Sequence, residues 1–168
     1  ASNVIINIIL HNLGDVKLRK KDIEKISISD CIAFAKDRYP FLSDRERMLL
    51  HIDVQQDFSI LGNRDLVVHV LFNLLKNALY HIAKGGRGEI YIETRVTDKQ
   101  GLLIVRDTGP GISAAQLPYI FDRFFTTTKS AGVGLAFCKM VMQALDGKIM
   151  CYSEVGKFTQ FTLSFPKV

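Results

Sequence analysis

The sequence predicts an α+β fold, a two-layer sandwich in which a mixed or antiparallel sheet packs against helices. Three observations support this class. A long apolar helical pattern runs from Asn63 to Lys84, and "EIYIETRV" and "GLLIVRD" alternate like adjacent strands. The 168 residues, 48% of them hydrophobic, suffice for one core plus an appendage.

The N-terminal third alternates between short helices and short strands. Residues 3–13, "NVIINIILHNL", read as the end of a helix that belongs to a larger protein. "ISISDCIAFAKDRYP" predicts a short strand and then a helix, capped by Ser29 or Asp30 and ending before Pro40. "MLLHIDV" and "FSIL" predict two more strands.

The remaining elements follow the long helix, which Asn63 should cap and "KGGRG" should end. The two alternating strands should turn around Asp98 to Gly101. A loop-like section precedes a helix over about residues 133–145, and "KIMCYSE" and "TQFTLSF" predict a closing hairpin. These elements in this order favour the two-layer sandwich.

Composition excludes several classes of protein. No apolar run reaches the roughly 18 to 20 residues of a membrane span, so we expect a soluble chain. The three cysteines have no paired spacing, which favours reduced thiols over a zinc site or disulfides. The basic run "KLRKKDIEK" is interleaved with acids and lacks stacking aromatics, so nucleic acid is not an expected partner.

Polar side chains in the long helix give the first chemical signal. In "HVLFNLLKNALYHI", Asn73 and Asn77 stand one turn apart on one face, with His69 a turn before and Tyr80 nearby. Asparagine is a mediocre helix former, which suggests a function. The alternative is that these amides cap a neighbouring element or face solvent.

Two glycine-containing stretches add to this signal. In "VRDTGPGISA", Asp107 ends a strand, and Gly109 and Gly111 free the backbone so that a ligand can lie against it. Such a carboxylate can accept a hydrogen bond from an exocyclic amine, although many tight turns share this composition. In "SAGVGLAFCKMV", Gly132 and Gly134 precede a helix whose free amides suit phosphate, or simply form a glycine-rich helix start.

The order of four motifs resembles one family. "NLLKNA", "DTGPGI", "FDRFFTTTK" and "GVGLAF" are similar to the N, G1, F and G2 boxes of the catalytic ATP-binding domain of sensor histidine kinases. That domain belongs to the GHKL superfamily, with gyrase, Hsp90 and MutL. The resemblance covers about residues 22–168 and implies the Bergerat-type sandwich. It also implies that residues 1–21 are the end of a dimerisation-domain helix and a linker, and that residues 112–131 form an ATP lid.

The resemblance also assigns site residues. It implies that Asp107 meets the adenine amine, that Asn77 holds Mg²⁺ against the phosphates, and that Thr159 lies near adenine. Asn73 and Asn77 would be the catalytic pair. The other residues it implies in ATP binding are Tyr80, His81, Gly109, Gly111, Ile112, Phe124, Thr127, Lys129, Gly132, Val133, Gly134 and Leu135. Phe121, Phe124 and Phe125 would anchor the lid, or pack in the core.

Some positions depart from the family pattern. Tyr80 stands where many relatives carry a basic residue, and His81 stands at the usual aromatic position. Ser130 and Ala131 replace a frequent "GT", Val133 replaces a leucine, and Phe158 replaces a glycine. We interpret these as variation within a working site.

The implied activity is transfer of the ATP γ-phosphoryl group, with Mg²⁺, to a histidine on a separate dimerisation domain, for relay to a receiver domain or response regulator. The full-length protein would be a homodimer, and this part a cytoplasmic domain of an inner-membrane sensor. His11 lacks the acid and proline that usually follow the acceptor histidine. "FNLLKNALYHI" and "FPKV" also resemble stretches of quorum-sensing hybrid kinases of the CqsS type.

Two alternatives from other classes remain. One is an ATP-hydrolysing machine of the gyrase or Hsp90 kind, and the other is a degenerate nucleotide-binding module that regulates a partner. The ATPases need a glutamate one turn before the magnesium asparagine, where this chain has Asn73.

Overall fold

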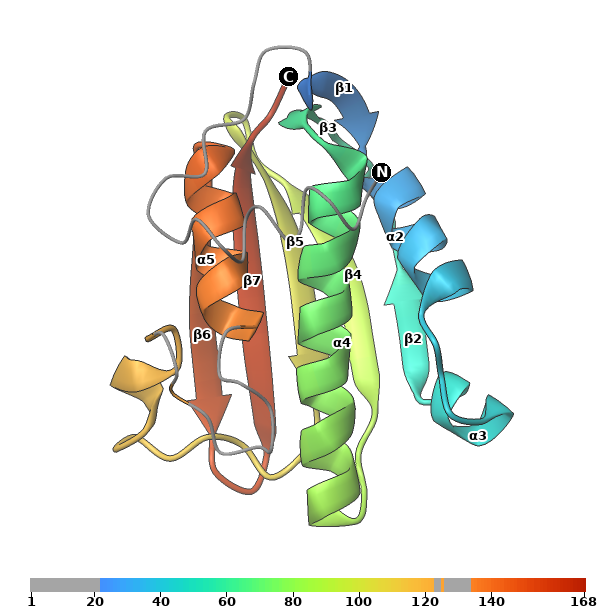
Figure 1. Cartoon of the computed structure of the whole chain (residues 1–168), viewed down its shortest axis with the longest axis vertical. Coiled ribbons are helices and arrows are strands. Elements are labelled where there is room, and N and C mark those ends of the chain that lie inside the picture. Colours follow the sequence, from blue (N-terminus) through green and yellow to red (C-terminus); the bar gives the residue numbers. More distant parts are fainter. Residues whose placement is uncertain (1–21, 123–124, 126–133) are drawn as a thin grey trace.

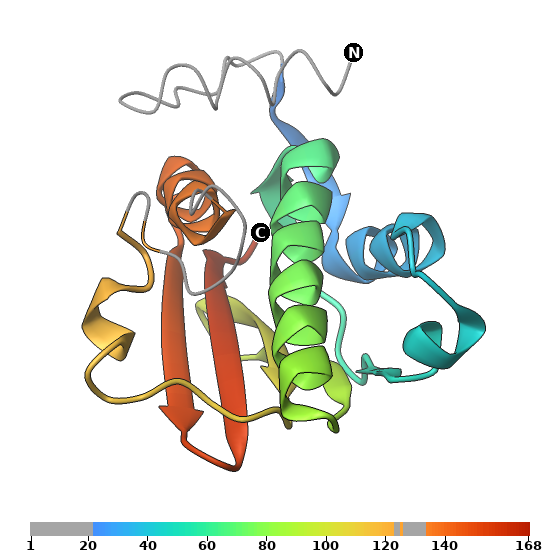
Figure 2. The ribbon, with the colours of Figure 1, turned by 60° about the horizontal axis from the view of Figure 1, so that its bottom comes forward.

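The computed structural model describes residues 22–122, 125 and 134–168 and has two layers (Figure 1). The helices are α2 (Ile28–Arg38), α3 (Asp44–Arg47), α4 (Arg64–Gly85), α5 (Gly134–Ala144) and the 3-10 turn η2 (Leu117–Tyr119). The strands are β1 (Glu24–Ser27), β2 (Leu50–Asp53), β3 (Ser59–Gly62), β4 (Ile90–Val96), β5 (Gln100–Asp107), β6 (Lys148–Glu154) and β7 (Phe158–Pro166). The long helix α4 lies between α2 and α5 on one face of the sheet (Figure 2).

The main sheet has the strand order β2-β4-β5-β7-β6. The β2 strand runs parallel to β4, and all other neighbours are antiparallel, so the predicted mixed sheet is confirmed. The β4–β5 pair and the β6–β7 hairpin are the predicted ones. A separate two-stranded sheet of β1 and β3 was not expected from the sequence.

Helix caps decide the helix starts. Asn63 caps α4 as predicted, because its side chain accepts a hydrogen bond from the Leu66 amide at 3.2 Å. The predicted cap of α2 was wrong: Ser27 is the cap and accepts from the Asp30 amide at 3.2 Å. The hydroxyl of Ser29 instead donates to Asp57, which comes from the chain before β3. This contact joins residues that are 28 positions apart in the sequence, so a local sequence pattern does not reveal it.

The core forms where α4 meets the sheet. Nine α4 residues are buried, and they are Leu66, Val67, Val68, Val70, Leu71, Leu74, Leu75, Ala78 and Ile82. Among the described residues, α4 is the one helix that is long and apolar enough to cross a membrane by length and composition. Half of that apolar window is buried inside the structure, as expected for a core helix.

The three cysteines are free thiols, as the spacing predicted. Cys31 and Cys138 are buried in the core, and burial raises the pKa of Cys31 to about 12. Thiols held in this neutral form are inert hydrophobic core groups.

Candidate functional site

Asp107 is a buried carboxylate at the end of a central strand. It is 3% exposed, and burial raises its pKa to about 6, against the opposing effect of a hydrogen bond from the Gly109 amide. That amide donates to Oδ1 at 2.9 Å. Within the described part of the chain no other hydrogen bond reaches the carboxyl group, so Oδ2 is open to a ligand. A buried acid with an open oxygen is typical of a binding site.

Thr159 stands directly opposite Asp107. The β5–β7 register pairs the two residues, and Thr159 is 1% exposed, so both side chains point toward the helical layer. The Thr159 hydroxyl lies 3.1 Å from the Ser153 hydroxyl on β6. A carboxyl group and a hydroxyl therefore lie side by side at the floor of the site.

The packing of the neighbouring hairpin explains why a glycine follows Asp107 at position 111. Gly111 has φ +77°, and a Cβ there would lie 2.5 Å from the Glu154 carbonyl oxygen. The Gly156 amide donates to the Pro110 carbonyl at 2.7 Å, which holds the β6–β7 turn against this loop. The positive φ agrees with the freedom expected of this glycine, and the direction of a side chain at Gly111 is occupied by the backbone of the neighbouring hairpin.

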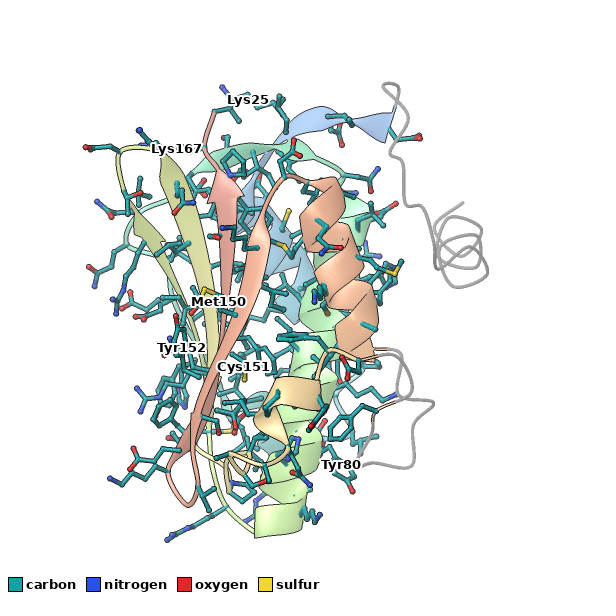
Figure 3. All side chains as sticks on the ribbon, turned by 90° about the vertical axis from the view of Figure 1, so that its left-hand side faces the viewer. Lys25, Tyr80, Met150, Cys151, Tyr152 and Lys167 are labelled. Carbon is teal, nitrogen blue, oxygen red and sulfur yellow. The ribbon has the colours of Figure 1, made fainter. Side chains whose placement is uncertain are left out.

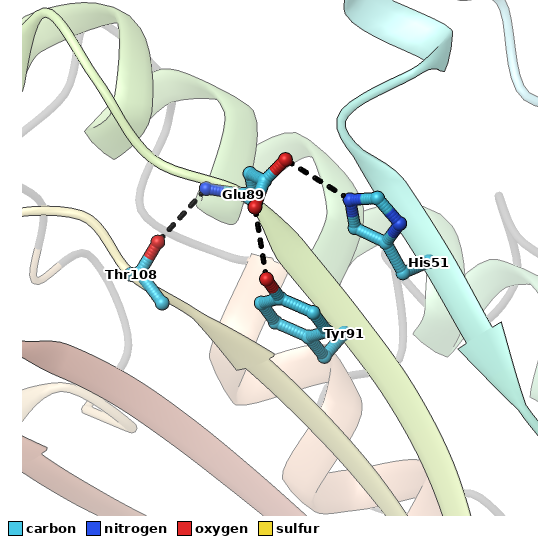
Figure 4. A network of polar contacts seen from close by, with 4 residues as sticks. All are labelled: His51, Glu89, Tyr91 and Thr108. Atoms are coloured by element: carbon cyan, nitrogen blue, oxygen red, sulfur yellow. Dashed lines mark hydrogen bonds and ion pairs between the residues drawn. The ribbon is translucent and has the colours of Figure 1, made fainter.

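A second set of contacts holds the loop from the β4 side (Figure 4). The Thr108 hydroxyl accepts from the Glu89 amide at 2.9 Å, and the Thr108 amide donates to the Glu89 carbonyl at 3.0 Å. The Glu89 carboxylate accepts from the Tyr91 hydroxyl at 2.8 Å, and its other oxygen lies 3.1 Å from His51 Nε2. The backbone around Asp107 is therefore held from both neighbouring strands.

The polar stripe of α4 divides into two roles. The Asn73 amide donates to the His69 carbonyl at 2.9 Å, and its oxygen would lie 2.8 Å from a Cβ on Gly134. Gly134 therefore lets α5 begin close to Asn73, whose amide group donates its hydrogen bond within α4. Asn77 is half-buried and, among the described residues, makes no side-chain hydrogen bond. Its amide oxygen is available to a metal or a water molecule.

Tyr80 and His81 lie one turn further along α4. Their rings meet edge to face at 5.6 Å, and both side chains are half-buried. His81 lies beside the loop, because its Cβ is 3.6 Å from the position of a Cβ on Gly109. Burial, with a smaller effect of Lys84, lowers the pKa of His81, so the ring is neutral at pH 7. Figure 3 shows Tyr80 on α4.

The first half of the expected lid is packed onto the core. Ile112 and Ile120 are buried, and Phe121 meets Phe161 edge to face at 6.2 Å. Phe125 also packs against the core, so core packing applies to these two rings. Leu135 packs there from α5. Other residues expected in the site lie outside the described part of the chain, and they are Phe124, Thr127, Lys129, Gly132 and Val133.

Sequence reasoning missed three residues of this site. Ser153 and Cys151 come from β6, where Cys151 faces the helical layer between the exposed Met150 and Tyr152 (Figure 3). Burial, and secondarily the Asp107 charge, raise the pKa of Cys151 to about 12. Thr108 is the third. Single serine and cysteine residues in an alternating strand carry no signal of their own.

The described residues fit a shared magnesium site better than a protein cage. No cluster of three or more His, Cys, Asp or Glu side chains occurs among them that would hold a metal ion. Mg²⁺ commonly binds through one or two protein oxygens together with substrate phosphates and water. The open amide of Asn77 fits that arrangement.

Comparison with known proteins places this geometry in a family. Residues 62–168 match the model of the histidine kinase-, DNA gyrase B- and HSP90-like ATPases, which implies ATP binding. The chain is 34% identical over 169 residues to the CAI-1 autoinducer sensor kinase/phosphatase CqsS of Vibrio cholerae, covering 99% of this chain and 24% of that protein. It is 36% identical over 166 residues to the autoinducer 1 sensor kinase/phosphatase LuxN of Vibrio harveyi, covering 98% of this chain and 20% of that protein.

Solved structures share the fold. The catalytic domain of histidine kinase ThkA gives a TM-score of 0.74 at 22% identity, over 86% of this chain and 95% of that domain. Full-length ShkA, solved in complex with AMPPNP, gives 0.78 at 22% identity, over 98% of this chain and 35% of that protein. The chain thus spans about a quarter or less of the CqsS and LuxN sequences. It belongs to the histidine kinase-, DNA gyrase B- and HSP90-like ATPase family, and its relatives there are sensor histidine kinases.

Proposed function

We propose that this chain is the ATP-binding catalytic part of a sensor histidine kinase and passes the γ-phosphoryl group of ATP to a histidine on a separate dimerisation domain. The observation that carries the proposal is the buried Asp107, open at Oδ2 and paired with Thr159, in a chain of this family. A buried acceptor at a strand end suits the exocyclic amine of adenine.

Four residues of the candidate site have a role in this mechanism. Asp107 accepts from the base, and Thr159 lies beside it. Asn77 would supply an oxygen to Mg²⁺, and the bound ion would neutralise phosphate charge. Asn73 lies close to Gly134 at the start of α5, whose first-turn amides have no intrahelical partner and favour an anion.

The transfer step needs a nucleophile from outside this site. The bond between the γ-phosphorus and the ADP oxygen breaks, a bond to an imidazole nitrogen forms, and the imidazole releases its proton. The three described histidines are engaged in other contacts. His51 is tied to Glu89 on the sheet edge, and His69 packs on Phe72. His81 is half-buried against Tyr80 and lies beside Gly109. We therefore place the acceptor on the dimerisation helices of the parent protein.

The wider setting is part of the same proposal. The relatives are far longer than this chain, and CqsS and LuxN are described as sensor kinase/phosphatases. We infer a homodimeric parent with dimerisation and phosphoacceptor helices, a receiver domain or response regulator as the next acceptor, and a cytoplasmic position below a membrane sensor. The half-buried Asn73, in place of a water-activating acid, makes the ATPase alternative less suitable.

The test is phosphoryl transfer in trans. Incubated with γ-labelled ATP and Mg²⁺, the 168-residue chain should label a fragment that holds the dimerisation helices and acceptor histidine of the parent protein. The Asn77→Ala variant should fold but lose at least about tenfold in transfer, since it lacks the magnesium ligand. A chain that binds ATP yet never labels a docking-competent fragment would instead be a regulatory module.

A further inference from the structure

Ser153 joins three parts of the nucleotide site. It lies on β6, opposite Thr159 in the β6–β7 register. Its hydroxyl oxygen is 2.7 Å from the Ile112 amide, 2.8 Å from the Phe158 carbonyl oxygen and 3.1 Å from the Thr159 hydroxyl. One side chain thus contacts the segment after the glycines, the hairpin turn and the residue beside Asp107.

The direction of these hydrogen bonds follows from their chemistry. A hydroxyl carries one proton and can accept two hydrogen bonds. The Phe158 carbonyl can only accept, so the Ser153 proton points to it, and the Ile112 amide can only donate, so it points to Ser153. The remaining contact requires Thr159 to donate to Ser153. The Thr159 oxygen is then left as an acceptor toward the ligand side.

We propose that Ser153 is a specificity-determining positioning residue, which holds the Thr159 hydroxyl as an acceptor beside Asp107 and so favours a 6-amino over a 6-oxo purine. The inference rests on the proposed function, namely ATP binding at this site. Two adjacent acceptors suit the two protons of the adenine amine. A carbonyl at the same position meets only acceptors and is rejected, because a buried polar group without a partner is costly.

The experiment compares ATP with inosine triphosphate, which has a carbonyl in place of the amine at purine position 6. Calorimetry on the 168-residue chain should show that Ser153→Ala weakens ATP binding by about fivefold and leaves inosine triphosphate binding unchanged or improved. The freed Thr159 hydroxyl can then donate to the carbonyl. The preference for ATP should therefore fall by about fivefold to tenfold.

Three further variants separate specificity from packing. Ser153→Thr keeps the hydroxyl and should restore the preference. Thr159→Val removes the oriented group, so adding Ser153→Ala to it should change the preference no further. Ser164→Ala, a serine on the other end of β7, serves as the matched control and should leave both affinities unchanged.

The outcomes are distinguishable. Equal weakening of both nucleotides by Ser153→Ala would reduce Ser153 to a packing role and overturn the inference. If Ser153→Ala does not fold, Thr159→Val decides the matter, since a preference that survives in it would also overturn the inference. A wild-type chain that binds neither nucleotide would contradict the proposed function itself, before any variant is compared.

Discussion

At the scale of single residues, the buried charge of Asp107 lowers the stability of the folded protein but suits it to bind a ligand amine. Its folded-state pKa of about 6 lies above the ordinary 3.8, because burial disfavours the charged form. Between these two pH values the folded state holds more protons than the unfolded state, so stability falls as pH rises through this window. Above pH 6 the protein carries the full cost of a buried charge, which a ligand amine would relieve.

Replacing Asp107 by Asn should therefore stabilise the protein and weaken ATP binding together. The Asn amide can still accept a hydrogen bond from Gly109 but carries no charge. The free energy of unfolding at pH 7 should therefore be higher than in wild type by on the order of 3 kcal/mol. That gain should vanish below about pH 4, where both forms are neutral. Its NH₂ group faces the adenine amine donor, so ATP affinity should drop at least about tenfold.

Thermal unfolding at several pH values and calorimetry with Mg-ATP measure the two effects. Asp98→Asn, at an exposed turn position, is the matched control and should change neither. A variant that binds ATP as wild type would remove Asp107 from the base site. A stability difference that is independent of pH would contradict its titration in the buried state.

Residue-level motifs could be predicted because they depend on local chemistry. The acid at the end of an apolar strand and the two asparagines one turn apart can be recognised directly in the sequence. The structure places Asp107, Gly109 and His81 together. The role of Ser153 depends on a strand register between segments far apart in sequence. The packing of Gly111 against Glu154 has the same origin, so neither was predictable.

At the scale of elements, the first half of the expected lid behaves as core. Its sequence suggested few buried residues outside the phenylalanines, yet Ile112 and Ile120 are buried and Phe121 contacts Phe161. The one-turn helix α3 was also missed, since four residues carry too short a period to detect. The short strands β1 and β3 were expected, but their pairing in a separate sheet was not, because it joins segments far apart in the sequence. The long α4 and the alternating strands were predicted because their patterns are long.

Amide hydrogen exchange should show where the lid begins. We expect residues 112–121 to be protected equally with and without a non-hydrolysable ATP analogue, since this segment is already packed. Any protection gained on binding should start after Phe121. Strong protection of residues 112–121 that appears only with the nucleotide would return the lid to its full expected length of residues 112–131.

At the scale of the whole molecule, the described part of the fold has an asparagine, Asn73, where a water-activating glutamate would stand in the proposed site. Asn73 is held by the His69 carbonyl and packed at Gly134, so it has neither the chemistry nor the freedom to activate a water molecule. The general fold class was predictable from the order of long elements. The strand order was not predictable, because β5 and β7 pair although η2, α5 and β6 lie between them in the sequence.

The isolated chain should therefore bind Mg-ATP, hydrolyse it slowly and fail to label itself. Asn73→Glu should not raise turnover, because the Asn73 amide oxygen already lies close to Gly134, so a longer side chain would crowd the start of α5. Phosphate release and self-labelling with γ-labelled ATP measure this, with Asp107→Ala as the blank for contaminating ATPases. Turnover that is rapid in wild type and absent in the blank would favour the ATPase alternative.

The central place of β5 also affects how the chain emerges during synthesis. This strand is buried in the finished sheet, between β4 and β7, and its middle residues Leu103, Ile104 and Val105 are apolar. The partner that covers its second edge, β7, is made later, after α5 and β6. A ribosome that stalls before β7 therefore presents an unpaired, apolar strand edge, which is the kind of surface that chaperones bind and that seeds aggregation.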